Sequence, residues 1–315
     1  MQHKSDEAIR KKALEDSLII CGEFDVVGHR MNYVLRVSTF GTKNGIHCSK
    51  VYFGLLDDTT REYSEQTYSY DANQVIVEDN KLMIRTDKFE LSDSVYGLKI
   101  YISYETFTLD FLLNHDDNLL KPQIKGRDDS DKKNGMYAYP NCTTVGSVSI
   151  SNEYFNVNGT ASYIRHYHDN PNFFERRFAR FSKQEEEKMN TVFGFFTLSN
   201  GLKITYLTIG NETTYNDFFV TFNRFGVVEE KTLFPIQNIV NYYMNLENKD
   251  EEYLMFELKT FDERIKLRVK RKMNIMTDLS PEHPEHIAGD RFTRIVGDFE
   301  GNKVSGFGYL SVTNI

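Results

Sequence analysis

Hydrophobic and polar positions alternate with a period of two along most of the chain. The apolar residues Met31, Tyr33, Leu35 and Val37 are separated mainly by polar ones, and the same alternation recurs over residues 107–113, 253–261 and 265–269. Because successive side chains of a β-strand point to opposite faces of a sheet, each segment is predicted to be a half-buried strand. Many such strands joined by short polar turns predict an all-β protein built from barrels or sandwiches.

Two dipeptides mark tight turns between predicted strands. Asn200-Gly201 lies between the apolar segments 191–198 and 202–209, and Gly301-Asn302 lies between the last two segments. Glycine adopts the positive φ angle that tight hairpin turns demand. A β-hairpin is therefore predicted at each dipeptide.

Helical patterns are confined to two short stretches. Ser5–Asp16 places Ile9 and Ala13 on one face with Ser5 as a cap, which predicts a short helix that covers a barrel end. Ser182–Glu185 matches a capping box, so a short helix or a polar linker is expected there. We place the boundary between two domains at this point, giving an N-terminal domain of residues 1–182 and a C-terminal domain of residues 183–315.

Composition and charge exclude several classes of protein. The chain has 315 residues, of which 40% are hydrophobic and 14% aromatic, enough for a substantial core without disulfides or metals. Its net charge of -8 gives no basic face for nucleic acid, and the basic run at 266–272 alternates with apolar residues as a solvated strand face does. Cys21, Cys48 and Cys142 include no Cys-x-x-Cys pair, which predicts free thiols.

The N-terminal residues and the hydropathy of the chain bear on location. Residues 1–16 are charged rather than apolar, and no apolar stretch approaches the roughly 20 residues of a membrane span. We expect a protein without a transmembrane segment that is cytoplasmic, unless a leader peptide has been removed. The loop at 125–134 has no apolar residue and is predicted to be an exposed connector rather than a lid.

Three short motifs follow one another between residues 134 and 161: NGMYAYPN at 134–141, VGSVSI at 145–150 and YFNVNGTA at 154–161. In this order they resemble the family of AttH-type lipocalin-like proteins and bacterial carotenoid hydratases. Residues 21–23 with 31–40, 195–206 and 306–313 extend the resemblance over most of the chain. It implies two lipocalin-like barrels with a cavity for a hydrophobic ligand, and hydration, cyclisation or isomerisation of terpenoid or polyketide substrates without a cofactor.

The sequence departs from this family after the Gly-Thr-Ala motif. Family members continue with Trp-x-Asp-His-x-Trp-Gly, whereas this chain, which lacks tryptophan, continues with SYIRHYHD at 162–169. An alignment without a gap puts the acid of the family motif at Ile164. A shift of two residues brings His166, His168 and Asp169 to that position instead.

The segment Arg165–Asp169 is the densest ionisable cluster in the sequence. Strand alternation would place His166 and His168 on one face and Arg165, Tyr167 and Asp169 on the other. Histidine titrates near neutrality and can pass a proton to or from a polyene, carbonyl or epoxide. We therefore predict Arg165, His166, His168 and Asp169 as catalytic residues, with structural histidines at a strand end as the alternative.

Aromatic and amide side chains near this segment could bind a substrate. We predict Tyr137, Tyr139, Asn141 and Tyr163 as the binding residues, because they add hydroxyl and amide groups to otherwise apolar surroundings. Aromatic packing between strands is the alternative for each tyrosine.

Other kinds of site are not indicated. His283 and His286 could suggest a metal site, but Pro281 and Pro284 break any helix that would align them, so we expect a loop and no metal. No Gly-x-Ser-x-Gly elbow, phosphate-binding loop or dinucleotide fingerprint occurs. Two functions remain. The first is a lyase or isomerase, of the hydratase or cyclase type, that acts without a cofactor on a small terpenoid, polyketide or lipid-like substrate. The second is a lipocalin-like protein that binds such a ligand without converting it.

Overall fold

The protein is built almost entirely of β-strands. The computed structural model describes residues 8–60, 62–78, 81–103, 107–115, 134–150, 153–169, 190–210, 215–224, 227–232, 236–244, 252–260, 265–273, 276–277 and 287–314. Within these ranges the only helical element is a three-residue 3-10 turn, Ala72–Gln74. The prediction of an all-β, lipocalin-like fold is confirmed.

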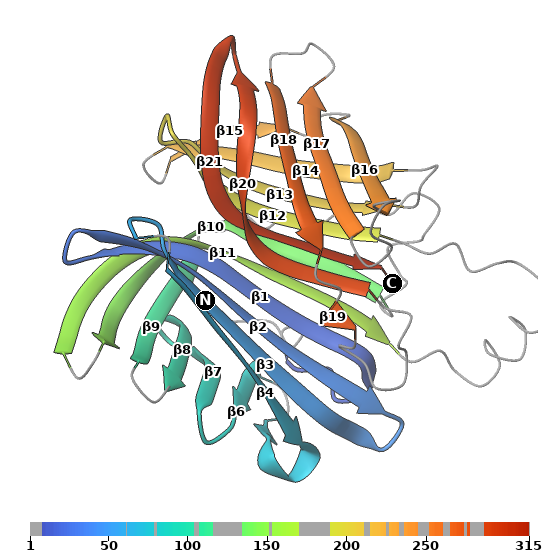
Figure 1. Cartoon of the computed structure of the whole chain (residues 1–315). Coiled ribbons are helices and arrows are strands. Elements are labelled where there is room, and N and C mark those ends of the chain that lie inside the picture. Colours follow the sequence, from blue (N-terminus) through green and yellow to red (C-terminus); the bar gives the residue numbers. More distant parts are fainter. Residues whose placement is uncertain are drawn as a thin grey trace, which may run out of the picture. The chain divides into compact units, whose positions relative to one another are not determined.

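Two compact units divide the chain. Residues 1–121 and 130–182 form the first unit, and residues 122–129 and 183–315 belong to the second. Each unit contains one antiparallel sheet (Figure 1). The assignment of residues 1–182 and 183–315 as two domains stays a prediction. Expressing each segment alone and measuring whether it folds would test it.

The sheet of the first unit runs in the order β4-β3-β2-β1-β11-β10-β9-β8-β7-β6-β5. The connection from β10 back through β11 to β1 places residues near 165 beside the first strand of the chain. Its strands are β1 (Ala13–Val26), β2 (His29–Thr42), β3 (Gly45–Asp57), β4 (Tyr63–Asp71), β5 (Ile76–Val77), β6 (Met83–Arg85), β7 (Phe89–Ser94), β8 (Gly97–Ser103), β9 (Phe107–His115), β10 (Asn134–Ile150) and β11 (Glu153–Asp169).

Contacts across this sheet show how strongly it curls. The rings of Phe53 on β3 and Phe107 on β9 stack with centroids 5.6 Å apart, although four strands lie between them in the sheet. In a flat sheet, with neighbouring strands about 4.8 Å apart, these rings would be separated by roughly 24 Å. The sheet therefore wraps around its own side chains, as a lipocalin-like barrel does.

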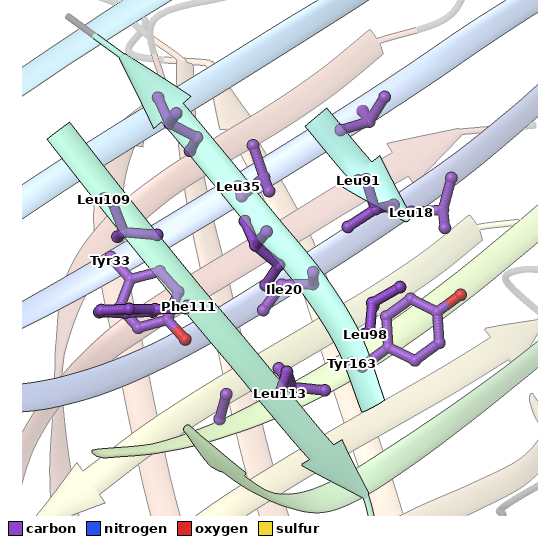
Figure 2. Close-up of a cluster of buried hydrophobic side chains, with 14 of the residues drawn as sticks. Leu18, Ile20, Tyr33, Leu35, Leu91, Leu98, Leu109, Phe111, Leu113 and Tyr163 are labelled. Atoms are coloured by element: carbon purple, nitrogen blue, oxygen red, sulfur yellow. The ribbon is translucent and has the colours of Figure 1, made fainter. Parts of the chain in front are cut away.

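The wrapped side of this sheet carries the main hydrophobic cluster. We call it the inner face; on β1 it comprises the even-numbered residues from Asp16 to Val26, and on β11 the odd-numbered residues from Phe155 to Tyr167. Figure 2 shows part of this cluster, including Leu18, Ile20, Leu35, Leu109 and Leu113. The opposite side, called the outer face, is also buried along much of β1 and β2.

The sheet of the second unit runs in the order β15-β14-β13-β12-β21-β20-β18-β17-β16, with β19 paired to β20. Buried side chains there include Phe193, Phe196, Ile204, Tyr309 and Leu310. Its strands are β12 (Asn190–Leu198), β13 (Lys203–Gly210), β14 (Tyr215–Arg224), β15 (Val227–Thr232), β16 (Ile236–Met244), β17 (Glu252–Thr260), β18 (Ile265–Met273), β19 (Met276–Thr277), β20 (Ile287–Phe299) and β21 (Asn302–Asn314).

Both predicted hairpins of the second unit are confirmed. Gly201 has a φ of +81° in the turn between β12 and β13, and its amide donates to the carbonyl of Leu198 at 2.9 Å. Between β20 and β21, Glu300 and Gly301 have φ of +51° and +82°. Two successive positive φ angles suit the right-handed twist of the flanking strands.

The predicted N-terminal helix is wrong over the part of it that the structure describes. Residues 8–12 form a bend and a turn, and strand β1 already begins at Ala13. Ile9 and Ala13 are buried as expected, but Ile9 belongs to the inner cluster of the sheet. Pairing of β1 with both β2 and β11 satisfies its backbone along its length, which outweighs a weak local helical pattern. The predicted loop at 125–134 lies outside the described residues except for Asn134, where β10 begins, and the helix or linker expected at 182–185 lies outside them as well.

Candidate functional site

A fully buried ion pair lies on the inner face where β1 and β11 meet. The Nε atom of Arg165 donates to Oδ1 of Asp16 at 2.9 Å, and its Nη2 atom donates to Oδ2 at 2.6 Å. Both side chains are 0% exposed. Burial opposes the charge on Arg165, but the Asp16 carboxylate holds the pKa of that guanidinium well above its usual value. Arg165 therefore carries its charge inside an otherwise largely apolar interior.

The segment that precedes β1 completes the surroundings of this pair. The carbonyl of Ala8 accepts from Nη2 of Arg165 at 2.7 Å, and the amide of Arg10 donates to Oδ2 of Asp16 at 2.8 Å. The guanidinium carbon of Arg10 lies 3.7 Å from the centre of the Tyr167 ring, a cation–π contact. Residues 8–10 thus cover the ion pair by backbone contacts, in an irregular conformation rather than as a helix.

Three tyrosines lie beside the ion pair on the same face. Tyr137 on β10 is the cross-strand partner of Arg165, and Tyr139 is the partner of Tyr163. The rings of Tyr139 and Tyr163 stack with centroids 5.9 Å apart, and Tyr137 meets both edge-on at 6.0 Å and 6.2 Å. Nη1 of Arg165 approaches the hydroxyl of Tyr137 at 3.5 Å.

A β-bulge in β10 follows the tyrosines. The register against β11 shifts between Tyr139 and Cys142, where Pro140 lacks the amide that a regular ladder requires. Ser162 stabilises the bulge, since its hydroxyl donates to the carbonyl of Pro140 at 2.8 Å. The bulge keeps both Tyr139 and Cys142 on the inner face, and Asn141 lies within it, half-buried.

Two ionisable members of this group, His115 and Asp16, were not predicted from the sequence. The ring of His115, the last residue of β9, stacks on Tyr139 with centroids 3.9 Å apart. His115 pairs across the sheet with Cys142 and continues the odd-numbered series that places Leu109, Phe111 and Leu113 inside. That parity was the available signal. Asp16 shares the even-numbered parity of the inner-face residues Leu18, Ile20, Phe24 and Val26 of β1.

His166 lies on the outer face, opposite to Arg165. There it is the cross-strand partner of Ser17, whose hydroxyl lies 2.5 Å from that of Ser38. Nε2 of His166 lies 3.9 Å from Oε2 of Glu15, and Arg36 donates to Oε1 of the same carboxylate at 3.2 Å. Burial raises the pKa of Glu15, but the charges of His166 and Arg36 together with hydrogen bonds lower it to about 2.

The predicted site residues therefore divide between two faces of one sheet. Arg165, Tyr137, Tyr139 and Tyr163 come together on the inner face, and His166 lies on the outer face. The predicted alternation of Arg165 and His166 along the strand agrees with this arrangement. The side chains of His168 and Asp169 lie outside the described residues, so their roles stay predictions.

Metal-binding chemistry has no candidate in the described part of the chain. No group of three or more His, Cys, Asp or Glu side chains gathers there, and the segment 282–286 lies outside it. Cys21, Cys48 and Cys142 form no disulfide with one another. Among the described residues, no helix has the length and apolar character that a membrane crossing requires.

The inner-face arrangement can bind and protonate an oxygen-bearing or unsaturated molecule. The Tyr137 hydroxyl accepts from Arg165, and as a phenol it also carries a proton that it can donate. A neighbouring cation stabilises the phenolate that remains after such a donation. The stacked rings of Tyr139, Tyr163 and His115 offer a flat aromatic surface.

Comparison with solved structures identifies the fold. No family model matches the chain, and no curated protein matches its sequence significantly. A protein of Nitrosomonas europaea provisionally assigned as AttH has 12% identity and a TM-score of 0.62, with 99% of this chain and 96% of that chain covered. Kievitone hydratase from Nectria haematococca has 11% identity and a TM-score of 0.62, with 98% and 91% covered. CghA bound to Sch210972 has 7% identity and a TM-score of 0.50, with 96% and 88% covered.

These matches span nearly the whole chain, although identity is too low to carry more than the fold. Both sheets are therefore part of the shared architecture. The chain has the lipocalin-like fold of the AttH and kievitone hydratase structures, and the AttH-type resemblance of its sequence is confirmed at the level of the fold.

Proposed function

We propose that this protein is a hydratase-type enzyme that acts on a small hydrophobic substrate bound against the inner face of the first sheet. The observation that carries the proposal is the buried Asp16–Arg165 ion pair beside Tyr137. Burying two charges costs free energy that a hydrophobic pair would not, so such a pair in a core points to a role beyond stability. The fold shared with kievitone hydratase supports the same reaction class.

The proposed chemistry adds water across a carbon–carbon double bond. Tyr137 donates its proton to one carbon, and Arg165 stabilises the phenolate. Water attacks the neighbouring cationic carbon and loses a proton, which returns to Tyr137. The net result is a hydrogen on one carbon and a hydroxyl on the other, with the enzyme unchanged. In this proposal Tyr139 and Tyr163 hold the substrate, and His115, whose ring stacks on Tyr139, assists proton transfer.

The experiment uses kievitone and a panel of terpenoid and polyketide polyenes in water labelled with oxygen-18. We expect a product that has gained one labelled water, detected by mass spectrometry. Tyr137→Phe removes the proton donor and should lower the rate by about 100-fold or more. Tyr101→Phe is the matched control, because Tyr101 lies on β8 between the inner residues Ile100 and Ile102 and so points to the other face.

A non-catalytic binding protein is the second candidate. It is favoured by the hydrogen bonds that the Arg165 guanidinium already donates within the protein, to Asp16, Tyr137 and the carbonyl of Ala8. A polar group with all its partners inside the protein need not act on a ligand. Retention of a probe in native mass spectrometry without any conversion would support this alternative.

A further inference from the structure

Two hydroxyl groups lie buried on the inner face away from the ion pair. Tyr33 on β2 is 1% exposed, and Thr144 on β10 is 2% exposed. Strands β1 and β11 lie between β2 and β10 in the sheet. The cross-strand partner of Tyr33 on β1 is Gly22, and that of Thr144 on β11 is Gly159.

These two glycines allow the side chains to lie flat across the sheet. A Cβ atom on Gly22 would come within 2.7 Å of the Tyr33 ring, and a Cβ atom on Gly159 would lie 2.8 Å from Oγ1 of Thr144. Real Cβ atoms do not approach other atoms so closely, so only glycine fits at either position. The Tyr33 and Thr144 side chains thus lie over the backbone of Gly22 on β1 and Gly159 on β11 and approach each other.

The two hydroxyls are neighbours but are not satisfied by the protein. Within the described part of the chain, neither Oη of Tyr33 nor Oγ1 of Thr144 makes a hydrogen bond of acceptable geometry. Burial raises the pKa of Tyr33, and the nearby Thr144 hydroxyl only partly opposes that rise, so the phenol is a proton donor at neutral pH. Two hydroxyls carry two protons, and only one can be shared between them. One donor therefore needs an acceptor from elsewhere.

Apart from the nearby Cys142 thiol, the surroundings of the pair are apolar. The Tyr33 ring contacts Phe24 and Phe111, with centroids 5.9 Å and 5.6 Å away (Figure 2 shows Tyr33 beside Phe111). Gly22 lies two inner-face positions beyond Leu18, the partner of Arg165, with Ile20 between them. At a rise of about 3.3 Å per residue, the hydroxyl pair and the ion pair are separated by roughly 13 Å of apolar wall.

We propose that Tyr33 and Thr144 form an oxygen-binding subsite for the polar end of an elongated hydrophobic ligand. This inference rests on the proposed function in placing the ligand on the inner face. The ligand class is an apolar molecule with a hydroxyl or carbonyl oxygen at one end and a reactive or polar group about 13 Å away. The oxygen accepts the proton that the hydroxyl pair cannot use internally.

The test measures binding without turnover, using farnesol and its hydrocarbon analogue farnesene as probes. The wild-type protein should bind farnesol more tightly than farnesene. Tyr33→Phe and Thr144→Val should each weaken farnesol binding by about 3- to 10-fold and leave farnesene binding unchanged. Thr144→Ser keeps the hydroxyl and is the matched control, for which we expect wild-type selectivity.

Equal affinity of Tyr33→Phe and wild type for farnesol would overturn the subsite. Where a variant does not fold, the wild type alone decides, because no preference for farnesol over farnesene also overturns it and leaves the pair as a site for bound water. Loss of the proposed hydratase function gives a different signature. In that case no probe gains labelled water, while the preference for farnesol and its dependence on Tyr33 persist.

Discussion

Asp16 and Arg165 are 149 residues apart in the sequence, yet they form a bidentate ion pair with neither side chain exposed. The pairing of β1 with β11 brings them together, since Arg165 lies opposite Leu18 and Asp16 lies opposite Tyr167 on the same face. The pair thus joins the first and last strands of the first unit's sequence at the centre of their sheet. Breaking the ion pair therefore tests how much this contact between β1 and β11 stabilises the sheet.

Replacing Arg165 with Met should destabilise the protein strongly. The substitution leaves the Asp16 carboxylate buried without its counter-charge, and breaking such a pair costs roughly 3–5 kcal/mol. The midpoint of urea unfolding measures the effect. The double variant Asp16→Leu with Arg165→Met should recover much of the loss, because it removes both buried charges.

An exposed ion pair in the same sheet is the control for this prediction. Arg85 and Glu90 lie 3.1 Å apart with side chains 49% and 20% exposed. Arg85→Met should change the unfolding free energy by less than about 1 kcal/mol. If Arg165→Met were equally mild, the buried pair would have no structural role and its ionised state would be in doubt.

Glu15 should make stability depend on pH in the acid range. Its pKa is lowered from 4.5 to about 2 in the folded protein. A carboxyl whose pKa is depressed by folding contributes stability above its unfolded pKa and loses it as pH falls through the folded value. The wild type should therefore lose up to about 3 kcal/mol between pH 4.5 and about 2 through this group.

Glu15→Gln cannot titrate and should lack this component of the acid loss. Unfolding free energies of wild type and variant, measured across that pH range, should converge as pH falls. Glu153→Gln, at an exposed position at the start of β11, is the control and should follow the wild type. Parallel curves for wild type and Glu15→Gln would contradict the arrangement of Glu15 between Arg36 and His166.

The sequence predicted local features better than distant contacts. Alternation over Met31–Val37 and the positive φ of Gly201 depend on a few neighbouring residues, and both predictions are confirmed. Alternation could not show that the outer face of β2 is buried as well. The helix expected before Asp16 rested on Ile9 and Ala13 alone, whereas the pairing of β1 with β11 depends on residues far along the chain.

The candidate site shows the same division. Arg165 and the tyrosines could be proposed from the sequence because they lie close together in it, next to a motif that resembles the AttH-type family, and their roles stay predictions. Asp16 and His115 were missed because their partners, Arg165 on β11 and Tyr139 on β10, lie far from them in the sequence. No local pattern indicated these contacts. Alternation predicted that Arg165 and His166 lie on opposite faces, but which of those faces is the inner one depends on how β11 pairs with β1.

Gly22→Ala should destabilise the first unit. The added methyl would lie 2.6 Å from the carbonyl oxygen of Thr160 and 2.7 Å from the Tyr33 ring. Since a backbone carbonyl on a neighbouring strand cannot move cheaply, overpacking of this kind costs about 1–3 kcal/mol. The melting temperature of the variant measures the effect. An unchanged melting temperature would show that the Tyr33 ring can move away from residue 22. The subsite proposed for Tyr33 would then lose its fixed geometry.

The last prediction decides between the two faces of the first sheet. Tyr137 and Arg165 lie on the inner face, whereas His166 lies on the outer face beside Glu15 and Ser17. If chemistry takes place on the inner face, Tyr137→Phe lowers turnover by about 100-fold or more, because it deletes a proton donor and keeps the ring. His166→Gln keeps a hydrogen-bonding side chain on the far side of the sheet and should change turnover by about twofold at most, while shifting the acid stability profile through Glu15. The reverse result, with activity lost in His166→Gln and kept in Tyr137→Phe, would move the reaction to the outer face and restore the histidine as the proton donor.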